Sequence, residues 1–189
     1  AFKRTKDDFK ALYDLHPNAI ACDLHPDYAS TRDAERSGLK VVHVQHHYAH
    51  ILSCMAEHQL NAPVLGVAWD GTGYGTDGTI WGSEFLQVST QGFARAASLR
   101  PFPLPGGDLA ASEPRRSALG LLYQMCGDDL PCAQLGFTRR ELRILLTALR
   151  QRINTPFTSS MGRLFDAVAA LIGLQQRCSF EGQAAMALE

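Results

Sequence analysis

Four histidines gather in the first third of the chain: His43, His46, His47 and His50. On a helix, the four-residue spacing of His46 and His50 places both imidazoles on one face, within reach of one metal ion, whereas His47 would point elsewhere. Imidazole binds zinc, iron, copper and nickel, so the pair does not identify the metal. Two ligands leave a metal site incomplete. The alternative is a pair of helix-end histidines bonded to backbone groups.

A glycine-rich segment, Asp70-Gly71-Thr72-Gly73-Tyr74-Gly75, follows a short apolar run. Glycines there let backbone N–H groups approach an anion closely, and the Thr72 hydroxyl adds a hydrogen bond. Asp70, at the end of the apolar run, is placed to bind a metal or orient a water. The segment has neither a Walker GK[ST] nor a helix-opening GxGxxG. The alternative is a glycine-rich hairpin, but a second acidic glycine turn at Asp77-Gly78 favours a binding role.

A third candidate lies at the expected start of a helix, where Gly162 and Asp166 are four residues apart. Backbone access at the glycine and the carboxylate then share one helix face, which suits sugar hydroxyls. The alternative is a capped helix on which Arg163 and Asp166 form a surface ion pair, and the local pattern favours this alternative. Two further segments, DLHPDY and PGGD, are compatible with simple turns.

Composition excludes several classes of protein. The chain has 189 residues, enough for one hydrophobic core, and a formal net charge of -1, which gives no reason to expect nucleic acid or an anionic membrane as partner. No apolar stretch is long enough to cross a membrane, so we expect a cytoplasmic protein. Five cysteines without a CxxC pair argue against a zinc ribbon or a disulfide framework.

The periodicity of apolar residues predicts strands and helices in alternation, then mainly helices. We expect strands at 18–23, 41–44, 64–69 and 79–88 and helices at 2–15, 30–38, 46–60, 109–125, 138–153 and 158–172. The run at 64–69 is apolar throughout, as in strands covered on both faces. Residues 93–108 read as a loop, with Asp108 as a helix cap, and Thr158 or Ser159 caps the last long helix. This order predicts an α/β layered fold whose strand-end loops carry the chemistry.

As a set, six motifs resemble one family. They are DLHPDY, VQHHYAH, DGTGYGTDGTIWGSEF, PLPGGD, SSMGRLFDAVAALIG and FEGQAA. In this order, over residues 23–189, they resemble the C-terminal region of the HypF family, carbamoyltransferases that help build the cyanide ligands of nickel–iron hydrogenases. That region is similar to tRNA threonylcarbamoyladenosine synthesis proteins and to antibiotic O-carbamoyltransferases.

The resemblance implies an actin/Hsp70-like (ASKHA) two-lobed α/β fold, incomplete in this chain. Residues 1–100 would form part of the first lobe and residues 101–189 the mostly helical start of the second. By their place in the motifs, His46, His50 and Asp70 would bind a divalent metal, iron or zinc. Asp70 would serve catalysis, and the glycine segment that it opens would hold phosphates through Gly71, Thr72 and Gly73. Gly162 and Asp166 would hold the nucleotide ribose.

The resemblance also implies substrates and partners. Carbamoyl phosphate and ATP would give carbamoyl-adenylate in a neighbouring domain of a longer protein, and this region would pass the carbamoyl group to the C-terminal cysteine of HypE. A further aspartate ligand would lie beyond residue 189, so we expect this chain alone to be inactive. Alternatives are a related O-carbamoyl or tRNA-modifying activity, a sugar-kinase-like enzyme, or a non-catalytic scaffold that docks HypE.

Overall fold

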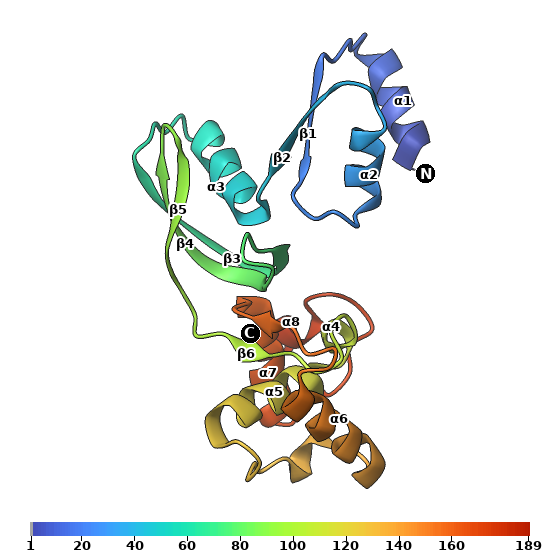
Figure 1. The fold of residues 1–189 in the computed structure, drawn as a ribbon, viewed down its shortest axis with the longest axis vertical. Helices are drawn as coiled ribbons and strands as arrows, with labels where there is room; N and C mark the ends of the chain where they lie inside the picture. The colour runs from blue at the N-terminus through green and yellow to red at the C-terminus, as the bar shows by residue number, and fades with distance from the viewer. Residues whose placement is uncertain (1) are drawn as a thin grey trace.

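The elements form three groups, of which the first two occupy the upper part of Figure 1 and the third lies below them. The structure is a computed structural model that describes residues 2–189. The first group contains α1 (Phe2–Leu12), β1 (Ala19–Asp23), α2 (Ala29–Glu35) and β2 (Lys40–Val44). The second contains α3 (His46–Glu57), β3 (Val64–Tyr74), β4 (Ile80–Ser89) and β5 (Gly92–Ser98). The third contains β6 (Phe102–Pro103), α4 (Leu109–Ser112), α5 (Pro114–Cys126), α6 (Arg139–Gln151), β7 (Phe157–Thr158), α7 (Met161–Leu171) and α8 (Gln183–Leu188).

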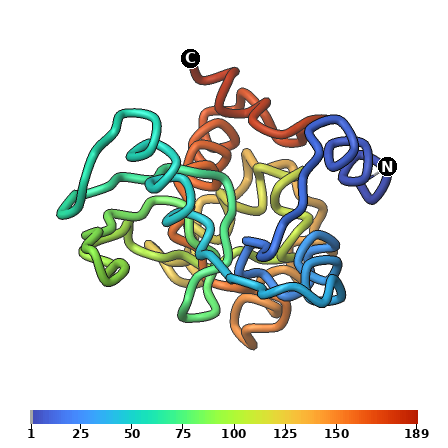
Figure 2. The backbone as a smooth tube through the Cα atoms, turned by 90° about the horizontal axis from the view of Figure 1, so that it is seen from above, coloured from blue at the N-terminus to red at the C-terminus, as the bar shows by residue number. Residues whose placement is uncertain are grey.

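The first group is built around two parallel strands. β1 and β2 pair in register from Ala19 opposite Lys40 to Asp23 opposite Val44. Because parallel strands run in the same direction, Asp23 and the residues that follow Val44 lie at the same edge of this small sheet. The strand predicted at 18–23 is β1, and it is only partly covered. The two ends of the described chain lie apart, also when the molecule is seen from above (Figure 2).

The second group is an antiparallel meander, and it corrects three expectations. β3 does not end at Trp69 but continues to Tyr74, with a register shift between Trp69 and Gly73, so the glycine-rich segment belongs to the strand. β3 is also not covered on both faces, because Leu65, Val67 and Trp69 are 63%, 51% and 60% exposed. Finally, residues 92–98, which overlap the predicted loop, form β5 and pair with β4.

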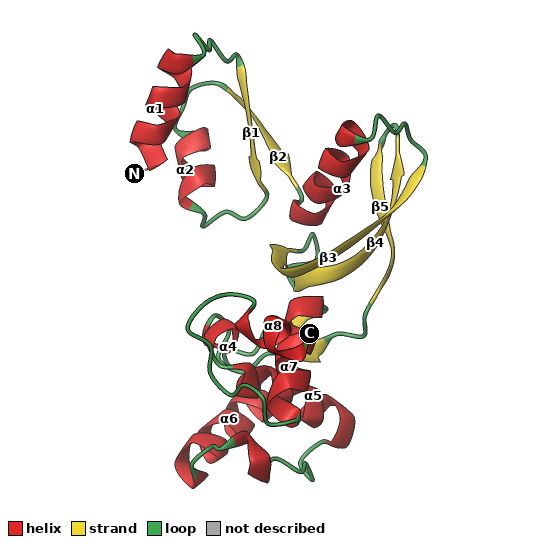
Figure 3. Cartoon of the chain, turned by 180° about the vertical axis from the view of Figure 1, so that it is seen from behind, coloured by secondary structure: helices red, strands yellow, loops and turns green. Residues whose placement is uncertain are grey.

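The third group consists mainly of helices, and Figure 3 shows them gathered beyond the sheet. The predicted helix over 109–125 is two helices, α4 and α5, because the chain leaves the helical conformation at Glu113, before Pro114. The Asp108 side chain does not cap α4, which corrects that expectation. Ser160, rather than Thr158 or Ser159, caps α7.

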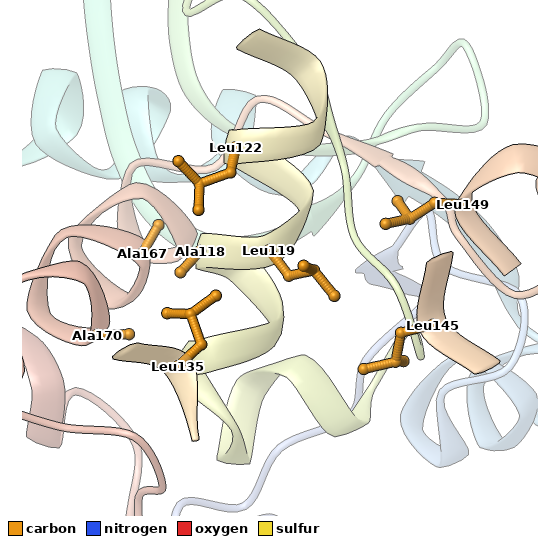
Figure 4. Packing of buried hydrophobic residues seen from close by; sticks show 8 residues of the cluster. All are labelled: Ala118, Leu119, Leu122, Leu135, Leu145, Leu149, Ala167 and Ala170. Atoms are coloured by element: carbon orange, nitrogen blue, oxygen red, sulfur yellow. The ribbon is translucent and has the colours of Figure 1, made fainter. Parts of the chain in front are cut away.

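A helical core holds the third group together. Figure 4 shows the buried side chains that α5, α6, α7 and the turn at 133–135 contribute, namely Ala118, Leu119, Leu122, Leu135, Leu145, Leu149, Ala167 and Ala170. The first turn of α6 is fixed by a capping box, in which Thr138 and Glu141 each accept from the other's backbone N–H. This core fixes α7, the helix whose first turn carries Gly162.

The sheet joins the second group to the third. Its strand order is β3-β4-β7-β6, and β5 pairs with the free part of β4. The five strands therefore come from both sides of residue 100, and a lobe boundary at that residue stays a prediction. Within residues 2–189, no helix is both long and apolar enough to span a membrane.

The glycine at position 66 brings α3 close to β3. A Cβ built on Gly66 would lie 2.5 Å from both Cδ1 and Cγ2 of Ile51, which is buried on α3. The helix that carries His46 and His50 is thus packed on β3 through a contact that leaves no room for a side chain at 66.

This contact predicts energetic coupling between the two positions. Gly66→Ala should lower the free energy of unfolding by about 1–3 kcal/mol because it overpacks the contact. Ile51→Ala should lower it by about 2–5 kcal/mol because it leaves a cavity. In the double variant the new methyl group fills part of that cavity, so chemical denaturation should show a loss at least about 1 kcal/mol smaller than the sum. Additive losses would show that the two positions do not pack together.

Candidate functional site

The three predicted metal ligands meet where α3 lies against β3. His46 Nε2 lies 2.9 Å from Asp70 Oδ2 and 3.3 Å from His50 Nε2, and His50 Nε2 lies 3.7 Å from the same carboxylate oxygen. One ligand atom from each residue falls within 4.8 Å of the others. In a tetrahedral zinc site, ligand atoms about 2.0–2.1 Å from the ion lie roughly 3.3 Å apart. The spacing of these donor atoms therefore fits a single ion.

The start of α3 sets the direction of both imidazoles. Gln45 caps the helix by accepting a hydrogen bond from the Tyr48 N–H, so that His46 is the first helical residue. Gly73 on β3 allows this turn to lie close, because a Cβ there would be 2.4 Å from His47 Cε1 and 3.0 Å from His46 Cβ. Gly73, predicted to hold phosphate, thus has a packing role in the structure.

Asp23 is a site residue that the sequence analysis missed. Its Oδ2 lies 2.7 Å from His46 Nδ1, because β1 and the segment after β2 end at the same sheet edge. A carboxylate on the far nitrogen of a metal-binding histidine fixes the ring and its tautomer, and leaves Nε2 directed at the metal. The adjacent Asp70 carboxylate raises the pKa of His46 to about 9, although burial opposes it, and Asp23 adds to the rise. Without an ion, His46 is therefore protonated at pH 7 and places a positive charge between the two carboxylates.

His47 also faces the site, which corrects the expectation that it points elsewhere. The side chain is fully buried, with Nε2 3.9 Å from Asp70 Oδ2. The Gln45 amide nitrogen lies 3.0 Å from His47 Nδ1, and donation from this amide places the ring proton on Nε2. Burial lowers the pKa of His47 to about 4, so its imidazole is neutral at pH 7.

Two atoms of the site lack a hydrogen-bond partner among the described residues. They are His47 Nε2 and Asp70 Oδ2, and both are buried. Asp70 Oδ2 lies near His46 Nε2, but the pair is not in hydrogen-bonding geometry. Buried polar groups in proteins are nearly always hydrogen-bonded, so these two atoms leave one donor and one acceptor available to a bound group. A cation beside Asp70 fits this observation and the donor set.

The glycine segment contacts the start of α7. Ser160 Oγ lies 3.0 Å and 2.7 Å from the carbonyl oxygens of Asp70 and Gly71, to which it donates, and it accepts from the Arg163 N–H. A Cβ on Gly162 would lie 2.8 Å from Gly71 Cα, so only a glycine fits there. The Thr72 hydroxyl donates to the Gly71 carbonyl and is therefore turned back on the chain.

A buried polar network fixes this contact from the other side. Glu84, fully buried on β4, accepts from Ser159 Oγ at 2.7 Å and from Arg95 Nε at 2.5 Å. Arg95 on β5 also donates to Ser159 Oγ at 3.1 Å. Because Ser159 precedes the cap residue of α7, this network joins β4 and β5 to the helix start. Nothing in the sequence indicates this network, because Glu84 resembles any polar residue of an ordinary strand.

Gly162 and Asp166 lie together on α7, but the Arg163–Asp166 pair is not at the surface. Arg163 and Asp166 are 5% and 4% exposed, and Arg163 Nη1 lies 2.9 Å from Asp166 Oδ2. Burial raises the pKa of Asp166 to about 6, and the charge of Arg163 opposes this rise. Asp166 is therefore mostly ionised at pH 7 and able to accept hydrogen bonds.

Carboxylates from all three groups of elements influence one tyrosine. Burial raises the pKa of Tyr28, and the negative charges of Asp23, Asp70, Asp108 and Glu181 raise it further. The end of β1, the glycine segment, the PGGD loop and the FEGQAA segment therefore all lie within electrostatic reach of Tyr28. By contrast, a cavity of about 1300 Å³ between α1 and β1 contains none of the predicted site residues.

Comparisons with known proteins agree with these motifs. The family described as "Carbamoyltransferase, Kae1-like Domain, second subdomain" matches residues 66–189, and "HypF Kae1-like domain" matches residues 1–57. Carbamoyltransferase HypF of Synechocystis sp. is 49% identical over 94% of this chain and 25% of its own length. That of Rhizobium leguminosarum bv. viciae is 45% identical over 95% of this chain and 24% of its own length. The chain spans about a quarter of the length of these curated relatives.

Solved structures show the same fold. Full-length HypF in a phosphate- and nucleotide-bound form has a TM-score of 0.92 and 45% identity, over 99% of this chain and 30% of that one. HypF of T. kodakarensis has a TM-score of 0.87 and 34% identity, over 99% of this chain and 27% of that one. These matches confirm the predicted fold class, the actin/Hsp70-like type to which the Kae1-like domain belongs.

The geometry of the site predicts which substitutions lower the affinity for a metal ion. In the full-length protein, His50→Ala should lower zinc or iron affinity at least about tenfold. Asp23→Asn should lower it by about 10- to 100-fold, because His46 loses the carboxylate that orients it. His58→Ala, an exposed histidine at the end of the same helix, should change nothing. Metal content after dialysis measures all three, and equal content in His50→Ala and the wild type would refute the ligand assignment.

Proposed function

This chain belongs to the HypF family of carbamoyltransferases, and on that premise we propose that it forms the part of a longer enzyme in which carbamoyl transfer takes place. The observation that carries the proposal is the convergence of His46, His50 and Asp70 beside a glycine segment that contacts the start of α7. A cation position and an anion-compatible backbone segment lie side by side there. Transfer of a carbamoyl group from a phosphate-bearing donor needs both.

The proposed donor is carbamoyl-adenylate, made from carbamoyl phosphate and ATP elsewhere in the longer protein. The proposed acceptor is the C-terminal cysteine of HypE. In the transfer, the cysteine thiol loses its proton and the thiolate forms a bond to the carbamoyl carbon. The bond from that carbon to the phosphate oxygen breaks, and AMP leaves. A relative whose solved structure is described as phosphate- and nucleotide-bound supports a donor of this chemical class.

A divalent metal, iron or zinc, would be held by His46, His50 and Asp70, whose donor atoms and orphaned carboxylate oxygen fit it. When bound, it supplies a Lewis acid that polarises the carbamoyl carbonyl or holds a phosphate oxygen. Asp23 keeps the His46 ring in the orientation that directs Nε2 at Asp70. Asp70 also accepts from its neighbour's N–H, Gly71 N to Oδ1 at 2.6 Å, which fixes the carboxylate plane.

The other residues of the site would hold the donor in place. Asp166, ionised and in the middle of α7, would accept hydrogen bonds from the ribose hydroxyls, and Gly162 would act with it by keeping the start of α7 in contact with the Gly71 backbone. The backbone of the segment from Gly71 to Gly73 would hold the phosphate. The Nε2–H of His47, which has no partner in the described part of the chain, is free to donate to a substrate oxygen beside Asp70.

The proposal predicts a selective loss of one half-reaction. In the full-length protein, Asp70→Asn should lower carbamoylation of the HypE C-terminus by at least about 100-fold, as measured by mass spectrometry. The change removes the negative charge from the ligand but keeps its shape. Carbamoyl-phosphate-dependent ATP–pyrophosphate exchange, which reports donor synthesis elsewhere in the protein, should stay near the wild-type rate, and His58→Ala should retain both activities. Normal carbamoylation by Asp70→Asn would instead favour a non-catalytic docking role for this region.

A further inference from the structure

Arg163 is buried, but not all of its N–H donors are hydrogen-bonded within the described part of the chain. The residue is 5% exposed, and its only ion-pair partner among residues 2–189 is Asp166. Its Nε makes no hydrogen bond within that part of the chain, and its Nη1 contacts Asp166 Oδ2 at 2.9 Å without hydrogen-bonding geometry. A guanidinium has five N–H donors, and leaving several of them unsatisfied in a buried position costs free energy. The geometry thus leaves donors available for a ligand.

The guanidinium is directed at the glycine segment. A Cβ built on Gly71 would lie 3.8 Å from Arg163 Nη2 and 3.5 Å from Glu181 Oε1, both ordinary contact distances. At Gly71 the missing side chain therefore leaves open space that faces Nη2 of the arginine. Gly71 leaves the space beside its own Cα open. At Gly162, by contrast, the Gly71 backbone occupies the position that a side chain would take.

The carboxylates around this space explain why an anion bound there would need the positive charge of Arg163. Asp70, Asp166 and Glu181 are carboxylates at or next to this space, and they would repel an anion. Arg163 supplies a fixed positive charge and a planar donor set, which suits a phosphate better than a point charge does. The guanidinium also lies at the start of α7, an 11-residue helix whose N-terminal end favours negative charge.

We propose that Arg163 binds the phosphoryl group of the nucleotide at Gly71 and so makes the site prefer a nucleoside monophosphate to the free nucleoside. This inference rests on the proposed function, because it assumes that the nucleotide ribose lies at Gly162 and Asp166. It adds to that function a residue that determines specificity. It also assigns the phosphate end of the nucleotide to the Arg163 side of the glycine segment.

The experiment compares AMP with adenosine on the full-length protein. Hydrogen–deuterium exchange of the peptides that contain residues 70–74 and 159–166 reports binding at this site alone, even if another domain also binds nucleotide. Titration of each compound gives an apparent affinity. Wild type should bind AMP more tightly than adenosine. Arg163→Met should lower AMP affinity at least about tenfold, as expected for loss of a charge-assisted hydrogen bond, and change adenosine affinity by less than about twofold.

Three further variants separate phosphate recognition from a merely structural role. Arg163→Lys should keep part of the preference for AMP, because it keeps the charge but loses the planar donor set. Asp166→Asn should weaken AMP and adenosine alike, since it acts on the ribose. Arg150→Met is the matched control, because Arg150 pairs with Asp128 on the exposed side of α6, and it should alter neither affinity.

Two results would overturn the inference. One is an Arg163→Met variant whose AMP affinity is unchanged. The other is an equal loss for AMP and adenosine, which would mean that Arg163 only positions Asp166. If Arg163→Met does not fold, the double variant Arg163→Met/Asp166→Asn, in which both charges of the ion pair are removed, replaces it. Its preference for AMP over adenosine should be about tenfold lower than that of Asp166→Asn alone. Wild-type protein that binds neither compound at these peptides would instead refute the nucleotide site on which the proposed function depends.

Discussion

The site depends on how closely other elements approach the backbone of β3 between Gly66 and Gly73. At Gly66 and Gly73 a Cβ would enter the side chains of α3, and at Gly162 it would meet the backbone of Gly71. Interiors of proteins are packed so densely that even one added methyl group is felt. Small residues at these positions therefore let one strand touch the helix that carries the imidazoles and the helix that carries Asp166. Without these close approaches, the two histidines and the carboxylate of Asp70 would not converge.

The electrostatics of the site follow from this crowding. Asp23, Asp70, Asp166 and Glu181 come from four different segments, and Arg163 and His46 balance part of their charge. A cluster of carboxylates this close together is unfavourable unless cations compensate it. The protonated His46 does so in the absence of an ion, and a bound divalent metal would do so more strongly. The carboxylates therefore need positive partners, which His46 and Arg163 supply in part and a bound cation would supplement.

The sequence predicted the features that depend on the spacing of residues within a single helix or strand. The four-residue spacing brought His46 and His50 to one helix face, and the end of an apolar run marked Asp70. Asp23 was within reach of the same reasoning, because it also ends a strand, but a single sequence does not reveal that β1 and β2 are neighbours. The open face of β3 was predicted wrongly, since an apolar run does not show whether anything covers it. Arg163 was misjudged because its burial depends on segments distant in sequence.

The most direct test of the account is the position of the ion itself. Anomalous diffraction from crystals of the metal-loaded full-length protein, recorded on both sides of the metal absorption edge, locates the ion without assumptions about its ligands. The account predicts a peak about 2.0–2.2 Å from Nε2 of His46, Nε2 of His50 and a carboxylate oxygen of Asp70. A fully loaded crystal with no anomalous peak among these three residues would contradict it.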